Sequence, residues 1–198
     1  VYAALGTKAA QWIIADSAGT ANIVIYGDKT FPSVTALQKG LESGLAECTT
    51  CTVQPIQYFT GDQIATVLPQ SIVSYLQQNP DVGYLFLPYD PAAAGIVPAL
   101  DAAGLNNIKL ISVLGSQENL NFIREGRIQV ADAAYDNLYM GYALLDQVAR
   151  TLTKNPLWEP QGENLPYVVL DKTNVPPAGD DWHASFDYKG SYESLWKG

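Results

Sequence analysis

Apolar residues follow two spacings along this chain, one typical of buried strands and one typical of helices. Short continuous apolar runs, such as NIVIY at 22–26 and GYLFLP at 83–88, predict strands that are covered on both faces. Between these runs, apolar residues recur every three or four positions, which predicts amphipathic helices. The pattern predicts strands over residues 22–26, 52–58, 83–88, 108–114, 127–133 and 166–171. It predicts helices over residues 2–17, 32–47, 61–78, 90–104, 117–125 and 136–154.

Helix and strand therefore alternate almost throughout, with four successive βα units. This alternation predicts an α/β fold in which a mostly parallel sheet is sandwiched by helices and the crossovers are right-handed. The segment from Asn174 onward is rich in proline, glycine and aromatic residues. We expect it to wrap the surface and to pack through Trp182, Phe186, Tyr192 and Trp196.

Acidic residues outnumber basic ones, with 20 Asp and Glu against 11 Lys and Arg and a formal net charge of -9. Binding to phosphates needs clustered basic side chains, so this balance argues against a nucleic-acid partner and against adhesion to an anionic membrane. No apolar run approaches the roughly 20 residues that span a bilayer. The chain begins at Val1 within a helical pattern, and we expect that a segment upstream has been removed.

The two cysteines, Cys48 and Cys51, form one local pair with three possible roles. A structural zinc site needs about four ligands, which two cysteines and His183 do not supply. A thioredoxin-like redox pair stands where a strand passes into a helix, whereas this pair follows a helix and precedes a strand. A small structural disulfide in an oxidising compartment fits best, and its short loop predicts a modest effect on stability.

Side chains suited to catalysis are sparse. The one histidine, His183, lies in the tail, so a Ser–His or Cys–His pair is not expected, and no GxGxxG or GxxxxGK[ST] motif occurs. We therefore expect no enzymatic activity, no cofactor and no metal site. Asp28, Asp90 and Asp136 follow predicted strands, where open α/β sheets bind ligands, although each is also explained as a helix N-cap or turn residue. Paired carboxylates for acid–base chemistry stay an open alternative.

Residues 75–113, with the sequence YLQQNPDVGYLFLPYDPAAAGIVPALDAAGLNNIKLISV, resemble type I periplasmic binding proteins of the sugar ABC-transporter class. Those proteins have here a helix, Asn or His before Pro-Asp-Val, a strand ending in Asp, a small-residue helix with Gly, then Ala-Gly and another strand. The resemblance continues through residues 125–127 and 132–141, and LPYVVLDKTNV at 165–175 resembles the final hinge strand. A CxxC motif before a strand also recurs in this class. The resemblance covers about residues 1–175.

The resemblance implies one part of a two-lobed protein whose lobes are joined by three crossings and clamp a ligand between them. Residues 1–133 correspond to the C-terminal lobe, and the N-terminal lobe is largely missing. Residues 134–164 correspond to a hinge and a helix that normally belongs to the other lobe, and residues 165–198 to a return strand and an aromatic-rich tail. Without its usual cover, we expect the apolar stripe of the 136–154 helix to pack on the tail or on a neighbouring chain. The stripe comprises Leu138, Tyr142, Leu145, Val148, Ala149 and Leu152.

Sugar-binding members of the class present an Arg, an Asn, an Asp and a Gln from the strand ends of this lobe. The residues that replace them here are, in that order, Thr35, Tyr89, Leu114 and Ala134. All four depart from the pattern, which argues against a simple pentose or hexose and predicts a flatter, less polar wall. The candidate ligand contacts are Phe31, Thr35, Tyr89, Asp90, Leu114, Ala134 and Tyr135.

Aromatic faces stack on sugar C–H surfaces or on aromatic ligands, so we expect a ligand with substantial apolar or aromatic surface, or a larger glycoside. Phe31 and Leu114 are equally well explained as core residues. Tyr2, Tyr26 and Tyr58 are expected to serve packing.

The resemblance implies the extracytoplasmic solute-binding component of an ABC importer, lipid-anchored or secreted in its full-length form. Its partners are a small sugar-like or partly aromatic ligand and an ABC permease, and closure of two lobes over the ligand is the expected mechanism. Half of the clamp is expected to bind weakly or not at all. Two alternatives stay open, namely the effector-binding domain of a LacI-type regulator, which shares this fold, and a sensor lobe that feeds a kinase. The CxxC motif and the acidity argue against the regulator.

Overall fold

A mostly parallel sheet forms the centre of the computed structural model, which describes residues 1–158 and 163–197. Its strands are β1 (Asn22–Gly27), β2 (Thr52–Val53), β3 (Gln57–Tyr58), β4 (Tyr84–Phe86), β5 (Lys109–Leu114), β6 (Gln129–Tyr135) and β7 (Tyr167–Asp171). Neighbouring strands follow the order β2-β1-β4-β5-β6-β7, and β3 pairs with β1. Every pairing among the described residues is parallel except that of β6 with β7. The α/β class and the mostly parallel sheet predicted from the sequence are therefore confirmed.

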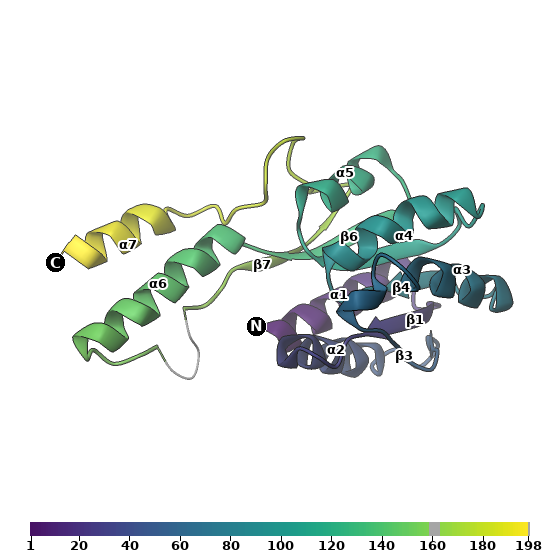
Figure 1. Cartoon of the computed structure of the whole chain (residues 1–198), viewed down its shortest axis with the longest axis horizontal. Helices are drawn as coiled ribbons and strands as arrows, with labels where there is room; N and C mark the ends of the chain where they lie inside the picture. Colours follow the sequence, from purple (N-terminus) through teal and green to yellow (C-terminus); the bar gives the residue numbers. More distant parts are fainter. Residues whose placement is uncertain (159–162, 198) are drawn as a thin grey trace.

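Helices cover both faces of this sheet (Figure 1). They are α1 (Tyr2–Asp16), α2 (Pro32–Leu45), α3 (Leu68–Gln78), α4 (Asp90–Ala102) and α5 (Gln117–Glu125). Ile23 and Ile25 of β1 pack with α1 and α2, whereas Val24 and Tyr26 pack with α3 and α4. Because successive side chains of a strand point to opposite faces, one continuous apolar strand supports both helical layers.

Two predicted elements are interrupted in the structure. The strand expected over 52–58 is two short strands, because Pro55 between them has no N–H to donate to the sheet. The helix expected over 61–78 begins only at Leu68, after a single 3-10 turn at Gly61–Gln63. Pro69 stands in the first turn of α3, where its missing N–H has no intrahelical partner to lose. Both predicted spans were too long.

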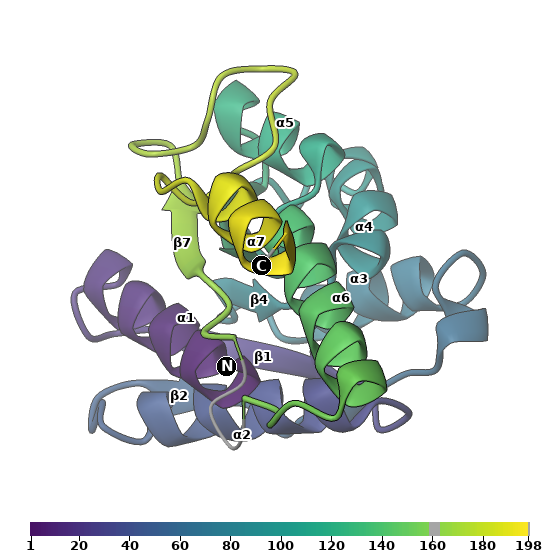
Figure 2. The same ribbon diagram turned by 90° about the vertical axis from the view of Figure 1, so that its left-hand side faces the viewer.

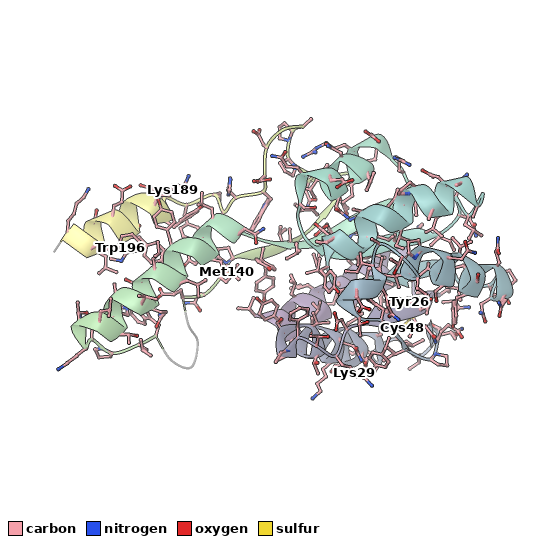
Figure 3. The ribbon with its side chains drawn as sticks, in the orientation of Figure 1. Tyr26, Lys29, Cys48, Met140, Lys189 and Trp196 are labelled. Atoms are coloured by element: carbon pink, nitrogen blue, oxygen red, sulfur yellow. A yellow bond between two sulfur atoms is a disulfide. The ribbon has the colours of Figure 1, made fainter. Side chains whose placement is uncertain are left out.

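The helices α6 (Asn137–Thr153) and α7 (Tyr188–Lys197) lie side by side and project from the lobe (Figures 1 and 2). Tyr142 of α6 stacks on Trp196 of α7, with ring centroids 5.8 Å and planes 9° apart. Trp196 lies on the side of α7 that faces α6 and donates its Nε1–H to Asp146 at 2.9 Å (Figure 3). The tail thus packs through aromatic rings as expected, but its final helix was not predicted.

The apolar stripe of α6 is covered only in part by this tail. Of the stripe residues, Tyr142 contacts the α7 side, and it belongs to one cluster with Tyr188 and Tyr192 and with two α6 residues outside the stripe, Tyr139 and Ala143. The stripe residues on the other side of α6 stay exposed, and the exposed fractions are 60% for Leu145, 55% for Val148 and 78% for Leu152. The expected packing of the stripe on the tail therefore accounts for one edge of the stripe and leaves the rest open.

Cys48 and Cys51 form a disulfide between the end of α2 and the start of β2, with Cα atoms 5.4 Å apart. The cross-link closes the short turn that brings the chain from the helical layer back to the sheet. Within the described ranges, none of the helices has the length and apolar character needed to cross a bilayer.

Candidate ligand-binding site

The carboxyl ends of β1, β4, β5 and β6 meet at one edge of the sheet because these strands are parallel. A hollow of about 160 Å³ lies at this edge, between the N-terminal ends of α1 and α2 and the loop that follows β4. Most of its lining is apolar or aromatic. The lining residues are Tyr2, Phe31, Ser33, Val34, Leu37, Pro88, Tyr89, Val113, Leu114 and Tyr135.

Aromatic rings from three elements form the walls of this hollow. Tyr2 and Tyr135 meet edge to face, with ring centroids 6.1 Å apart. Burial, and then the neighbouring Tyr2, raise the pKa of Tyr135 to about 12, so its hydroxyl is neutral at physiological pH. Phe31, just before α2, is 49% exposed and so presents a free ring face. The rings can stack on a ligand.

Tyr89 is held in place by a buried carboxylate at the end of β1. Its hydroxyl donates to Asp28 Oδ2 at 3.0 Å, and the backbone N–H of Thr30 donates to Asp28 Oδ1 at 2.8 Å. Burial by itself raises the pKa of Asp28, but the hydrogen bonds from Thr30 and Tyr89 outweigh it, so the pKa lies below its ordinary value. Burial, together with Asp28, raises the pKa of Tyr89. The hydroxyl of Tyr89 is thus engaged, and its ring is the part left for a ligand.

Leu114, at the end of β5, has an unusual backbone conformation. Its φ is 134°, and the following Gly115 has φ 79°. A positive φ is unfavourable for a branched side chain such as leucine, by on the order of 1–3 kcal/mol, and such strain is retained where surrounding structure enforces it. The enforced turn carries the Leu114 side chain onto the wall of the hollow.

The sequence matches a known family over most of its length. Residues 2–156 match the family described as a periplasmic binding protein domain. The chain belongs to this family. No curated protein matches it.

Solved structures of periplasmic binding proteins have the same fold. An ABC sugar transporter subunit from Rhodobacter sphaeroides 2.4.1 superimposes with a TM-score of 0.74 at 22% identity, over 87% of this chain and 63% of that one. An ABC transporter solute-binding protein from Agrobacterium vitis with bound allitol gives 0.75 at 21% identity, over 88% and 61%. The Caulobacter myo-inositol binding protein bound to myo-inositol gives 0.75 at 22% identity, over 88% and 59%.

This chain spans about three fifths of the length of each of those proteins. The family and the type I periplasmic binding protein fold that the sequence resembled are confirmed by these matches.

Four of the seven predicted contact residues of this periplasmic binding protein line the hollow together, namely Phe31, Tyr89, Leu114 and Tyr135. The other three, Thr35, Asp90 and Ala134, do not line this hollow.

Each of the other three has a physical reason for its position. Thr35 lies on the exposed side of α2, where its hydroxyl donates to the carbonyl of Phe31. Asp90 is buried outside the lining of the hollow and accepts a hydrogen bond from Ser112. Ala134 packs with Leu170 on the opposite face of the sheet from Tyr135, because neighbouring strand residues alternate in direction.

Tyr2 is the main lining residue that the sequence did not indicate, since it was expected only to pack. It reaches the hollow because α1 lies across the sheet beside β6, a placement that only the strand order decides. Ser33, Val34 and Leu37 were likewise missed, although the predicted N-terminus of the helix beginning at Pro32 was a usable signal.

The arrangement is suited to holding a ligand. Among residues 1–158 and 163–197, no group of three or more His, Cys, Asp and Glu side chains is placed to hold a metal ion. His183 lies beside the buried Asp136, with Nδ1 at 3.3 Å from Oδ1, and outside the hollow.

Proposed function

We propose that this chain is the ligand-gripping part of an extracytoplasmic solute-binding protein that delivers a small sugar-like or partly aromatic ligand to an ABC permease. The aromatic hollow at the carboxyl ends of four parallel strands carries the proposal, because open α/β sheets bind ligands at this edge. Membership of the periplasmic binding protein family supports it.

We also propose that residues 1–133 act as one lobe, residues 134–164 as a hinge and part of a second lobe, and residues 165–198 as a return strand and tail. Residues 159–162 and 198 lie outside the described residues. The projection of α6 and α7 away from the sheet supports this division (Figure 1). The exposed Leu145 and Leu152 of α6 are typical of a face that packs against further protein.

The walls of the hollow favour a ligand that offers a flat apolar face. Tyr89 has its hydroxyl committed to Asp28, and the Leu114 side chain has no polar group, so two positions on the wall contribute packing area instead of new hydrogen bonds. The exposed ring of Phe31 adds a third apolar surface. A glycoside with an aromatic or alkyl aglycone satisfies these walls better than a fully hydroxylated sugar, since each unpaired buried hydroxyl is costly.

Ligand-observed saturation-transfer NMR tests this proposal, since it detects the weak binding expected of half a clamp. The probes are phenyl β-glucoside, glucose, allitol and myo-inositol. We expect the strongest transfer to the phenyl protons, and we expect Phe31→Ala to weaken binding about fivefold, because an aromatic stack is worth ~1 kcal/mol. Phe186→Ala, at a similarly exposed phenylalanine on the α7 side, serves as the matched control and should leave the signal unchanged.

Equal signals from Phe31→Ala and wild type would count against the hollow as the site, and so would stronger transfer to glucose than to the phenyl glycoside. The gene upstream of Val1 provides an independent check. A signal sequence supports the importer, whereas a helix-turn-helix segment supports a LacI-type regulator and a neighbouring kinase gene supports a sensor.

We further propose that the exposed face of α6 makes this chain self-associate when no other protein covers it. Sedimentation velocity at tens of micromolar should show a dimer or larger species, and Leu145→Lys with Leu152→Lys should shift it to monomer, because two charges oppose burial of the face. Val67→Lys, at an exposed apolar residue of the lobe, is the control. A monomeric wild type whose α6 amides resist hydrogen exchange would show the idea to be wrong.

A further inference from the structure

A group of fully buried polar side chains lies on the face of the sheet opposite Val113 and Tyr135 of the hollow. Its members come from the start of α4, the middle of β5, α5 and β6, and none is more than 1% exposed. They are Asp90, Ser112, Asn119, Gln129 and Asp132. Two of the five are acids, which is unusual for a site without a basic partner. Buried polar groups are costly unless they are bonded, so the hydrogen bonds of this cluster define its protonation.

The hydrogen bonds of the cluster run in one direction. Ser116 Oγ donates to Asn119 Oδ1 at 2.9 Å, and Asn119 Nδ2 donates to Gln129 Oε1 at 2.8 Å. Gln129 Nε2 then donates to Ser112 Oγ at 2.6 Å. Because Ser112 accepts from Gln129, its own hydroxyl proton is free to go to Asp90 Oδ1, 2.6 Å away. The chain of donors thus ends on the carboxylate of Asp90.

Asp132 stands inside this chain with no hydroxyl proton left for it. Its Oδ1 accepts the backbone N–H of Gly115 at 2.9 Å, and its Oδ2 accepts from Gln129 Nε2 at 3.2 Å and lies 3.2 Å from Ser112 Oγ. The single proton of Ser112 is already used at Asp90, so a proton on Asp132 would make its contact with Ser112 a hydrogen bond and would remove one of two neighbouring buried negative charges. None of the ion pairs of the described residues reaches either acid.

The electrostatics of the two acids likewise favour a proton on Asp132 and a negative charge on Asp90. Burial, and then the negative charge of Asp90, raise the pKa of Asp132 well above its ordinary value. Burial also raises the pKa of Asp90, but hydrogen bonds from Asp132, Ser112 and Ser116 oppose the rise, and the first turn of α4 favours a negative charge. Tyr135 is the further titratable group that the Asp90 charge affects, and it stays neutral.

The two acids hold the turn that forms one wall of the hollow. The backbone N–H of Gly115 donates to Asp132, and that of Ser116 donates to Asp90 at 2.6 Å. These two residues directly follow Leu114, whose positive φ needs an enforcing environment. The carboxyl pair is therefore placed to keep the strained turn in position.

We propose that Asp132 is a neutral, protonated acid paired with an ionised Asp90, and that this pair is the positioning element for the Leu114 wall of the ligand hollow. The importance of that wall for a ligand rests on the function proposed above. The protonation of Asp132 and its positioning role do not rest on that function, and both are testable without a ligand.

Substitutions at Asp132 separate a neutral acid from a charged one. Asp132→Asn copies the shape and neutrality of the protonated acid, so we expect a Tm within about 2 °C of wild type below a pH of about 4, where Asp132 is protonated in the folded and the unfolded state. Asp132→Ala leaves a cavity and an unpaired Gly115 N–H, and we expect it to lower the Tm by roughly 5–10 °C. Because the folded pKa of Asp132 is raised, wild-type stability should fall relative to Asp132→Asn as pH rises above about 4, the ordinary Asp value.

Infrared spectroscopy detects a protonated carboxyl group directly. Wild type at neutral pH should show the carbonyl band of a protonated carboxylic acid, and Asp132→Asn should lose it. Asp136→Asn is the matched control, because Asp136 is equally buried but has a lowered pKa, and this variant should keep the band. Absence of the band from wild type, or its survival in Asp132→Asn, would overturn the protonation.

Methyl NMR of Leu114 tests the positioning. The Leu114 methyl resonances should keep their wild-type shifts in Asp132→Asn and move in Asp132→Ala. Unmoved resonances in a folded Asp132→Ala would overturn the positioning role. If Asp132→Ala does not fold, the infrared band and the flattened pH dependence of Asp132→Asn still decide the proposal. A failure of every sugar probe to bind would contradict the proposed function and leave these results unchanged.

Discussion

Gly40→Ala is expected to lower the free energy of unfolding by about 3 kcal/mol, because its methyl group has no space at the crossing of α1 and α2. A Cβ at Gly40 would overlap the backbone carbonyl of Ala3, and one at Gly6 would overlap the carbonyl of Leu37. Both obstacles are backbone atoms, so the two helices have to separate to admit a methyl group. The helices pack this closely only because glycine occupies these positions.

The same substitution should disturb the ligand hollow. Tyr2 lies at the start of α1 and Phe31 just before α2, so separation of the two helices moves one wall of the hollow relative to the other. We therefore expect the phenyl β-glucoside signal to fall together with stability.

Urea unfolding followed by circular dichroism measures the effect. Gly95→Ala, in the exposed interior of α4 with no atom within 4 Å of the added Cβ, is the matched control. It should stabilise the protein by about 0.5–1 kcal/mol, because alanine is the better helix former. Similar effects from the two substitutions would mean that the α1–α2 contact is not close-packed.

Asp136→Ala is also expected to lower the free energy of unfolding by about 3 kcal/mol, because this buried carboxylate joins three parts of the chain. Its oxygens accept the backbone N–H of Tyr139 and that of Ala184, both at 2.9 Å. They also accept from the Tyr188 hydroxyl at 3.4 Å and contact the ring of His183. Asp136 caps α6 and ties the tail to it, so its loss should free the tail as well as fray the helix.

The pH dependence of this contribution has a definite sign. Burial by itself raises the pKa of Asp136, but the amides of Tyr139 and Ala184 and the ring of His183 outweigh it, so the pKa lies below its ordinary value. The stabilisation is present above the ordinary Asp value of about 4 and is lost as pH falls through the lower pKa of the folded state. The gap in stability between wild type and Asp136→Ala should therefore narrow below pH of about 4.

Hydrogen exchange read by mass spectrometry locates the effect. Amides of residues 184–197 should exchange faster in Asp136→Ala, whereas those of α3 should not change. Asp181→Ala, at an exposed acid in the same tail, is the control and should match wild type. Unchanged protection of residues 184–197 would mean that the stacking of Tyr142 and Trp196 alone holds α7.

The strands were predictable because their signal is local. NIVIY and IKLISVL are mostly apolar on both sides, and such runs flanked by turn residues predict buried strands in a parallel sheet. Helix starts were predictable where a proline stands in the first turn, as at Pro32 and Pro91. The last helix was missed because tyrosine, tryptophan and glycine give it weak helical propensity, and packing on α6 stabilises it instead.

The sequence by itself determined the α/β class, the parallel order of its units and the aromatic character of the strand ends. These features follow from the order of apolar and polar residues over short stretches of sequence, because the geometry of a helix or strand fixes which of those residues share a face. Only the tertiary structure decided which of the strand-end residues share a wall. It turned Ala134 to the opposite face, brought Tyr2 to Tyr135, and buried Asp90 with Asp132, because strand order and helix crossing place residues together that are far apart in sequence.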